Sequence, residues 1–289
     1  MSVVYLAINE KANKTWAVKE IRSGSELGME AVRERMIAET ELLKHLRHPG
    51  LPVIVDVIDE GEGFLIVMDY IEGKSLKEVL AREGAQSQER TLLWGKQLCG
   101  VLSYLHEQEP PVIYRDMKPS NIMVQPDGSL KLIDFGTARE LRDVYAEDDT
   151  ICLGTPGYAA PEQWEGCGQT DARTDIYCLG MVLYEIVTGQ GPEKTFCDRK
   201  PVQLQKPCLS AGLEEILRKC TQRDPGQRFQ SCRELIYALE HYREMDLRWR
   251  KKQKRRLSLF LAAALASLLC FLGAFYAWHM EVRLEKDTY

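Results

Sequence analysis

Residues 114–134 constrain the fold and the chemistry of this chain more than any other stretch, because they combine charged residues with short apolar runs. Asp116, Lys118 and Asn121 fall in a segment that contains Pro119. A proline in such a position interrupts a helix, so the three polar residues are predicted to lie on a loop. The stretch therefore predicts a loop that presents a carboxylate, an ammonium group and an amide.

Two apolar runs, Ile122–Val124 and Leu130–Ile133, follow this loop and are separated by the turn residues Gln-Pro-Asp-Gly-Ser. This pattern predicts the two strands of a hairpin. The hairpin brings its ends together, so the amide oxygen of Asn121 and the carboxylate of Asp134 are expected to face one point. Oxygen ligands of this kind suit Mg²⁺, which keeps waters and takes few protein ligands. We therefore expect Mg²⁺ here, with Mn²⁺ as an alternative.

The loop and the Asp-Phe-Gly triplet beginning at Asp134 resemble the catalytic loop and metal-binding triplet of the protein kinases, with Tyr114 replacing the commoner His. Lys118 followed by Pro resembles the serine/threonine kinases and not the tyrosine kinases. The resemblance implies that Asp116 contacts the substrate hydroxyl, Lys118 the γ-phosphate, and Asn121 with Asp134 the Mg²⁺ ion. The triplet alone is explained by a turn, but two coupled motifs at loop spacing are not.

The first part of the chain predicts a nucleotide site. Residues Val3–Ile8 and Thr15–Lys19 flank a polar turn and predict two strands. Ala17-Val-Lys19 resembles the strand motif whose lysine holds the α- and β-phosphates of ATP. Residues 30–46 predict a helix, and the resemblance places on it the acidic partner of this lysine, Glu39. Two other acids of this helix are explained as ordinary solvated charges: Glu34 and Glu41.

The next predicted strands, Val53–Val55 and Phe64–Met68, lead into Asp69-Tyr-Ile71, which resembles the hinge between the two kinase lobes. The resemblance implies that backbone groups of Asp69 and Ile71 bind the adenine edge, with Met68 behind the purine. Backbone recognition suits a flat heterocycle and leaves side-chain identity loose. ATP is therefore the expected cosubstrate.

The rest of the pattern is mainly helical. Three helices are predicted from their apolar residues: Ser75–Leu80, Arg90–His106 and Ile176–Thr188. Ser231 and Glu234 predict a capping box before a final amphipathic helix that includes Tyr242. His106 is expected to be structural because it has no evident partner. The resemblance implies that Asp175 braces the backbone of the catalytic loop.

Residues 154–162 resemble the end of the activation segment in eukaryotic-type kinases of bacteria, with Gly154-Thr-Pro-Gly-Tyr leading into Ala-Pro-Glu162. The resemblance implies that Arg228 pairs with Glu162. Residues 190–210 contain three prolines and no apolar period, so no substrate-docking helix is predicted there.

Two threonines of this segment are assigned different roles. Thr150 is predicted to be autophosphorylated, with Arg115 among its partners, because a dianion beside an arginine can order a loop. The neighbouring acids Asp148 and Asp149 oppose a phosphate there. Thr155 is expected to be structural.

The resemblance also implies a shortened phosphate-covering loop. Val4 lies where the glycine-rich loop of the family carries its valine, and Ser2 takes the position of the third glycine. The first strand would precede Met1, so the small lobe is expected to lack it. Two explanations stay open, a start assigned at an internal Met and a chain that begins here. The first is favoured because every other catalytic part is present.

The other end of the chain predicts a membrane segment. A basic run at 246–256 precedes residues 257–278, which carry no charge. Twenty-two helical residues span about 33 Å, enough for a hydrocarbon core of about 30 Å. The excess of Lys and Arg predicts that the N-terminal side is cytoplasmic and that residues 279–289 form a short external tail. Localisation in the cell membrane is therefore expected.

Small residues recur at four-residue steps in this segment: Ala262 and Ala266, Ala263 and Ser267, Gly273 and Ala277. Such pairs let helices approach closely in lipid, so a homodimer through residues 257–278 is one interpretation. The other is a plain anchor, because small residues are common in membrane helices.

The expected fold class is α+β, a two-lobed kinase with one transmembrane helix. Residues 1–69 are assigned to the small lobe and residues 70–245 to the large lobe. The expected function is a membrane-anchored serine/threonine kinase acting on proteins, with a pseudokinase or scaffold as the alternative. A small-molecule kinase is disfavoured by the protein-kinase features of residues 154–162. The net charge of −5 gives no argument for nucleic acid, and the nine cysteines show no zinc or disulfide pattern.

Overall fold

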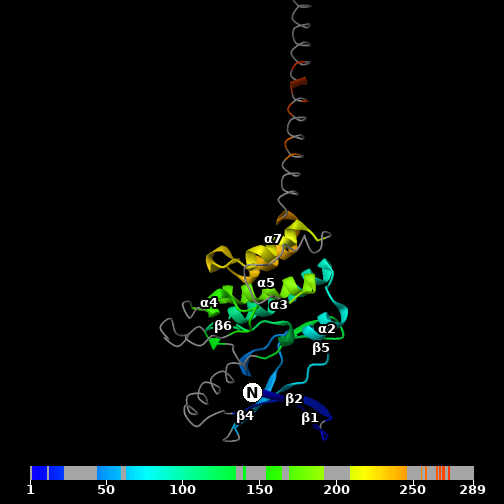
Figure 1. Ribbon diagram of the computed structural model, residues 1–289, viewed down its shortest axis with the longest axis vertical. Coiled ribbons are helices and arrows are strands. Elements are labelled where there is room, and N and C mark those ends of the chain that lie inside the picture. Colours follow the sequence, from blue (N-terminus) through cyan, green and yellow to red (C-terminus); the bar gives the residue numbers. More distant parts are fainter. Residues whose placement is uncertain are drawn as a thin grey trace, which may run out of the picture.

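The computed structural model describes residues 2–11, 13–22, 44–59, 63–134, 139–140, 154–164, 169–191 and 209–245, with isolated residues between 255 and 273. Figure 1 shows the strands of residues 2–69 gathered at one end of this part of the chain and helices stacked beyond them. This arrangement agrees with the expected α+β class.

Four of the described strands form an antiparallel sheet in the order β1-β2-β4-β3. Their bounds are Ser2–Asn9 for β1, Lys14–Arg22 for β2, Ile54–Asp59 for β3 and Gly63–Asp69 for β4. Each hairpin forms because apolar runs rich in β-branched residues flank a polar turn. Asn13 in the first turn has a φ of 46°, which asparagine tolerates better than most residues. The predicted strands are confirmed, although β3 starts one residue later and runs further than predicted.

The register of this sheet brings the predicted nucleotide residues onto one face. Val4 pairs with Lys19, and Lys19 pairs with Ile66 on the other side. Ala17, two residues before Lys19, pairs with Met68. Residues two apart on a strand, and residues paired across strands, share a face. Val4, Ala17, Lys19 and Met68 therefore lie on the same side of the sheet.

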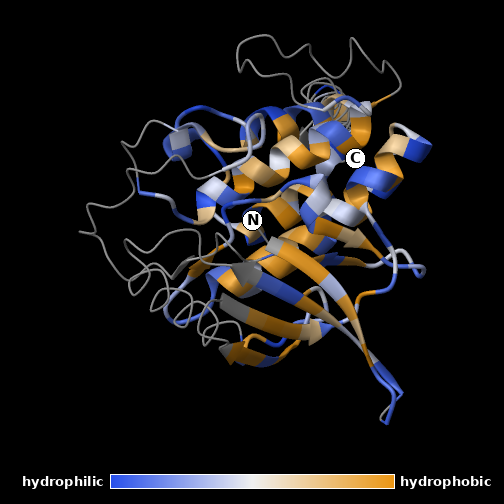
Figure 2. Ribbon diagram, turned by 60° about the horizontal axis from the view of Figure 1, so that its bottom comes forward, coloured by the Kyte–Doolittle hydropathy of each residue, from blue (hydrophilic) through white to orange (hydrophobic). Residues whose placement is uncertain are grey.

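The helical part is built around α5 (Ala172–Thr188), whose residues are buried on almost every side. A helix that is apolar all round belongs in the interior of a domain. Its contact partners include α3 (Gln88–His106) and α7 (Ala211–Cys220), and α8 (Cys232–Glu240) packs against α3 and α7. Figure 2 shows that hydrophobic residues are frequent in these central helices and in the strands. The predicted central helix is confirmed, and it begins four residues earlier than expected.

The remaining described elements are short. The remaining described helices are α2 (Leu76–Glu83), α4 (Pro161–Trp164) and the 3₁₀ turns η1 (Pro119–Asn121), η2 (Pro225–Gln227) and η3 (Tyr242–Met245). The other described strands are β5 (Lys74–Ser75), β6 (Val112–Ile113), β7 (Ile122–Val124), β8 (Leu130–Leu132) and β9 (Arg139–Glu140). β7 pairs with β8 and with β5, and β6 pairs with β9.

Several boundaries differ from the sequence-based expectation because side chains cap the helices. Ser75 lies outside α2 and accepts a hydrogen bond from the backbone of Glu78. Ser231 likewise caps α8, but the Glu234 carboxylate accepts from Gln230 N, so the predicted reciprocal box is only half correct. α8 ends at Glu240, and Tyr242 lies in η3.

The helix α7 was not predicted. Ser210 caps it, and its buried residues recur with helical spacing: Leu213, Ile216, Leu217 and Cys220. These residues hold α7 against α5 close to Gly180, where an added Cβ would lie 2.5 Å from the Cβ of Cys220. The sequence carries this spacing, so the helix was predictable although it is short and follows a proline-containing stretch.

Among the described residues, no helix combines the length and the hydropathy needed to cross a membrane. Residues 257–278, the predicted membrane segment, lie almost entirely outside the described part of the chain.

Candidate active site

The hairpin of β7 and β8 brings the two ends of the predicted site together. Ile122 pairs with Leu132, and the N–H of Ile133 donates to the carbonyl of Asn121 at 2.8 Å. Asn121 and Asp134 therefore stand at the same end of the hairpin, as predicted.

Tyr114 ties the catalytic loop to this hairpin. Its phenol donates to the carbonyl of Ile133, the residue before Asp134. Complete burial raises the pKa of Tyr114 well above its ordinary value, so the phenol stays neutral and remains a donor. The residue that replaces the commoner His thus supports the position of Asp134.

Two residues of the site have a left-handed backbone that is unfavourable for any residue with a Cβ. Arg115 has a φ of 69° and Asp134 a φ of 67°. Such conformations persist only where surrounding contacts determine them. Asp175 provides such contacts, because its carboxylate accepts from Tyr114 N at 2.9 Å and from Arg115 N at 2.7 Å. The predicted bracing role of Asp175 is confirmed.

His106 has a partner that the sequence did not reveal. Its Nε2 lies 2.8 Å from Oδ2 of Asp175, and Sγ of Cys232 lies 3.7 Å from its Nδ1. The residue lies beneath the loop and supports Asp175. This agrees with a structural role, but the expectation that His106 has no partner was wrong.

The carboxylate of Asp116 is held by three side chains. Lys118 Nζ lies 2.7 Å from its Oδ2, and Asn121 Nδ2 donates to the same oxygen at 3.1 Å. Thr155 donates to the other oxygen at 2.7 Å and accepts from Lys118 at 2.8 Å. The structure therefore brings these four residues together, and the predicted structural role of Thr155 stays a prediction, with its hydroxyl bound to Asp116 and Lys118.

Lys19 connects the sheet to the catalytic loop through an ion pair with Asp134. Among the described residues Lys19 is buried, whereas the side chain of Asp134 is 43% exposed. The predicted partner of Lys19, Glu39, lies outside the described residues, so the Lys19–Glu39 pair stays a prediction.

The oxygen atoms at the end of the hairpin fit a magnesium ion. Asn121 directs its amide nitrogen to Asp116. Its amide oxygen has a long contact of 3.4 Å with Oγ of Ser120 and keeps a second lone pair for a cation, and Asp134 offers a carboxylate. Within the described ranges, no group of three or more His, Cys, Asp or Glu residues could hold a metal. A site with few protein ligands is what Mg²⁺ favours, because it keeps waters and binds substrate phosphates.

The predicted hinge follows the end of β4. The N–H of Asp69 donates to the carbonyl of Val53 at 3.0 Å. The backbone group of Asp69 that could bind the adenine edge is therefore its carbonyl. Ile71 makes no hydrogen bond within the described part of the chain. The hinge backbone is thus compatible with adenine binding, which stays a prediction.

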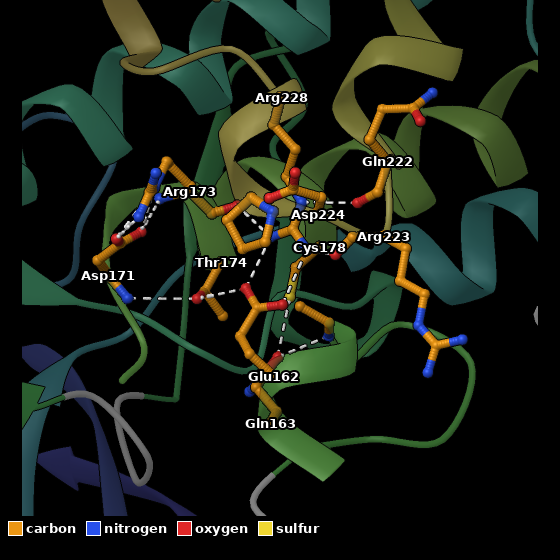
Figure 3. A network of polar contacts seen from close by, with 12 residues as sticks. Glu162, Gln163, Asp171, Arg173, Thr174, Cys178, Gln222, Arg223, Asp224 and Arg228 are labelled. Atoms are coloured by element: carbon orange, nitrogen blue, oxygen red, sulfur yellow. Dashed lines mark hydrogen bonds and ion pairs between the residues drawn. The ribbon is translucent and has the colours of Figure 1, made fainter. Parts of the chain in front are cut away.

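The end of the activation segment is fixed by the predicted ion pair between Glu162 and Arg228, with N–O distances of 2.6 and 2.8 Å (Figure 3). The Arg228 side chain is completely buried, and it also donates to three backbone carbonyls: those of Gln222, Arg223 and Arg173. Thr174 donates to Glu162 at 2.9 Å. A buried pair with all its donors used fixes geometry strongly. This prediction is confirmed.

The predicted regulatory pairing is only partly within the described residues. Thr150 lies outside them, whereas Arg115 is buried in the catalytic loop. The pairing of Arg115 with a phosphorylated Thr150 therefore stays a prediction.

Several polar contacts near the site were missed from the sequence. Tyr158 donates to the carboxylate of Glu185 in α5, and partial burial raises the pKa of Glu185 above its ordinary value. Gln163, buried in α4, contacts Ala160 and Arg115. A polar residue within a mostly apolar helix, such as Glu185, is the kind of signal that marks a buried partner.

The sequence of this chain is similar to those of known proteins. The family model of the protein kinase domain matches residues 1–241. The chain is 33% identical over 254 residues to a probable serine/threonine-protein kinase, CPE1738, of Clostridium perfringens, covering 83% of this chain and 36% of that protein.

Two further relatives agree with this match. The serine/threonine-protein kinase PrkC of Bacillus subtilis is 30% identical over 246 residues, covering 81% of this chain and 37% of PrkC. The serine/threonine-protein kinase PknB of Mycobacterium tuberculosis is 31% identical over 256 residues, covering 81% of this chain and 40% of PknB. The chain thus spans less than half the length of these curated relatives.

Proposed function

The chain belongs to the protein kinase family, among the eukaryotic-type serine/threonine kinases of bacteria, and from this we propose that it transfers the γ-phosphate of ATP to serine and threonine hydroxyls of proteins. The observation that carries the proposal is the constellation around Asp116. Its carboxylate contacts Lys118, Asn121 and Thr155, and Asn121 joins it through the hairpin to the Lys19–Asp134 pair.

The roles of the loop residues follow from this constellation. Asp116 orients the attacking hydroxyl and accepts its proton, because its carboxylate is the acceptor held at the centre of the loop. Lys118, 2.7 Å from that carboxylate, provides positive charge for the phosphoryl group in transfer. Holding the two groups together lowers the entropic cost of aligning the hydroxyl and the phosphate.

Lys19 binds the α- and β-phosphates of ATP after its ion pair with Asp134 opens. Its predicted partner Glu39 then fixes the ammonium group. Asn121 and Asp134 would hold Mg²⁺, with Mn²⁺ as an alternative. When bound, the ion supplies positive charge to the phosphate oxygens.

The adenine is proposed to lie against the sheet face that carries Val4, Ala17 and Met68. These apolar side chains share the face of Lys19, so a purine beside them directs its phosphates toward the ammonium group. The carbonyl of Asp69 and the N–H of Ile71 are proposed to bind the adenine edge.

A phosphotransfer assay on a generic serine- and threonine-containing protein tests the proposal. We expect the Asp134→Asn variant to lose Mg²⁺-dependent transfer by about a hundredfold or more, because charge on the transferring group is then unshielded. Transfer by Asp134→Asn at the parental rate would reject the site. A parent chain that binds ATP but transfers no phosphate would favour the pseudokinase or scaffold alternative.

Membrane attachment through residues 257–278 is part of the same proposal. It rests on their uncharged sequence and on the basic run before them. Self-association through the small residues of this segment is proposed to bring two kinase chains together, which would allow autophosphorylation at Thr150.

A further inference from the structure

Gln163 occupies an unusual position between the activation segment and the catalytic loop. It follows Glu162 in α4, and only 5% of its surface is exposed. Its Oε1 accepts from the N–H of Ala160 at 2.8 Å, and its Nε2 donates to the carbonyl of Arg115 at 2.9 Å. A backbone N–H can only donate and a carbonyl can only accept, so these two partners fix the orientation of the amide.

The neighbours of this amide restrict it further. Cys178 of α5 places its Sγ 3.5 Å from Oε1 of Gln163 (Figure 3). Gly154 packs on the opposite end, where an added Cβ would lie 3.3 Å from Nε2 of Gln163. The amide is thus enclosed by α5, by the residue before Thr155 and by the catalytic loop.

The carbonyl that Gln163 binds belongs to the peptide unit that joins Arg115 to Asp116. Arg115 has the left-handed φ of 69°, and its N–H is bound by Asp175 at 2.7 Å. Gln163 holds the carbonyl of the same residue. The backbone leading into Asp116 is therefore held on both sides, by Asp175 from α5 and by Gln163 from α4.

We infer that Gln163 is a positioning residue, which couples the position of residues 154–162 to the orientation of the Asp116 carboxylate. The inference rests on the proposed kinase function and deepens it. Without the amide, the Arg115–Asp116 peptide keeps the bond from the Asp116 N–H to the Tyr114 carbonyl and a long contact of 3.9 Å from Sγ of Cys178, and it is held less firmly in its left-handed conformation. Thr155 and Lys118 then meet the Asp116 carboxylate at a different angle, and the substrate hydroxyl is aligned less often.

Two substitutions test the hydrogen bonds that the Gln163 amide makes with Ala160 and Arg115. Gln163→Met keeps the length of the side chain and removes both bonds. Gln163→Glu keeps the acceptor for Ala160 and places a carboxylate against the carbonyl of Arg115. The matched control is Gln86→Leu, because Gln86 is also buried and also donates to a backbone carbonyl, that of Gly84, in a turn outside the site.

We expect kcat of both Gln163 variants to be lower than that of the parent by about tenfold or more. Their KM for ATP, and the rise in Tm that the nucleotide causes, are expected to stay within about twofold of the parental values. Gln86→Leu is expected to keep kcat within about twofold. A kcat of the Gln163 variants equal to that of the parent would overturn the inference. So would a loss of kcat matched by an equal loss of nucleotide binding, since that result indicates general damage to the fold.

Hydrogen exchange gives a readout that does not depend on catalysis. The N–H of Asp116 donates to the carbonyl of Tyr114 at 2.9 Å, and its protection reports the conformation of the loop. We expect this amide to exchange at least about tenfold faster in both Gln163 variants and at the parental rate in Gln86→Leu. Unchanged exchange in the Gln163 variants overturns the inference even if the parent chain proves inactive, in which case the proposed function fails separately.

Discussion

Thr155 lies between the two charged residues of the catalytic loop. It donates to Asp116 at 2.7 Å and accepts from Lys118 at 2.8 Å, so one hydroxyl fixes both groups. Its removal leaves Lys118 and Asn121, which both bind the Oδ2 oxygen, so Oδ1 of Asp116 loses its donor from Thr155. The hydroxyl therefore determines how the carboxylate faces an incoming substrate.

We predict that Thr155→Val, which keeps the shape of the side chain, lowers kcat by about tenfold or more, whereas Thr155→Ser stays within a few-fold of the parent. Steady-state phosphorylation of a fixed protein substrate measures both variants. Equal rates for Thr155→Val and the parent would show that the hydroxyl serves only the fold.

The main residues of the site were predictable because they lie in short segments with characteristic spacing. Asp116, Asn121 and Asp134 fall within one loop and hairpin, and local chain geometry alone brings them together. Thr155 and Gln163 reach the same loop from 39 and 48 residues away in sequence. Contacts of this length depend on how helices pack, which residue spacing alone does not specify. Those of Glu162 with Arg228 and of Asp175 with Tyr114 were predicted only through the resemblance to a known family.

At the scale of elements, α5 and α7 approach each other closely at Gly180. A Cβ at Gly180 would lie 2.5 Å from the Cβ of Cys220 and 2.9 Å from Cγ2 of Thr221. Both atoms belong to the end of a packed helix and its cap, so they cannot move away cheaply. The glycine is therefore required by packing and not by backbone conformation.

We predict that Gly180→Ala lowers the free energy of unfolding by about 1–3 kcal/mol, because the added methyl pushes α7 away from α5. The matched control is Gly100→Ala in α3, where an added Cβ meets no atom within 4 Å. That substitution is expected to raise stability by about 0.5–1 kcal/mol, the difference in helix propensity. Denaturant unfolding of both variants decides, and a Gly180→Ala variant as stable as Gly100→Ala would refute the packing account.

Long elements were predicted better than short ones. The apolar spacing of α3 and α5 extends over several turns and outweighs any local ambiguity. The strands β5, β6 and β9 have two residues each, and they pair because the loops around them are already placed. A strand of two residues is too short to show a periodic pattern in the sequence.

At the scale of the whole molecule, Lys19 of the sheet and Asp134 of the catalytic loop form an ion pair over 115 positions in sequence. The pair joins the two parts that the sequence predicted as separate lobes. ATP must enter between these residues in the proposed reaction, so opening of the pair couples nucleotide binding to the relative position of the two parts.

We predict that the full chain partitions into membranes through residues 257–278. The full chain should stay in the membrane pellet after washing with high salt and with alkaline carbonate, because about 22 apolar residues bury in lipid. A chain that ends at Met245 should remain in the supernatant. Release of the full chain by salt alone would show that only the basic run at 246–256 contacts the membrane surface.

The most direct test of the account is a single-turnover measurement with γ-labelled ATP, Mg²⁺ and a protein substrate, comparing the parent chain with Asp116→Asn. The parent is predicted to place acid-stable label on serine and threonine. Asp116→Asn is predicted to bind the nucleotide with similar affinity. It is predicted to transfer the label at least about a hundredfold more slowly, because the acceptor for the hydroxyl proton is lost. Transfer by Asp116→Asn at the parental rate, or absence of label on serine and threonine with the parent, would contradict the account.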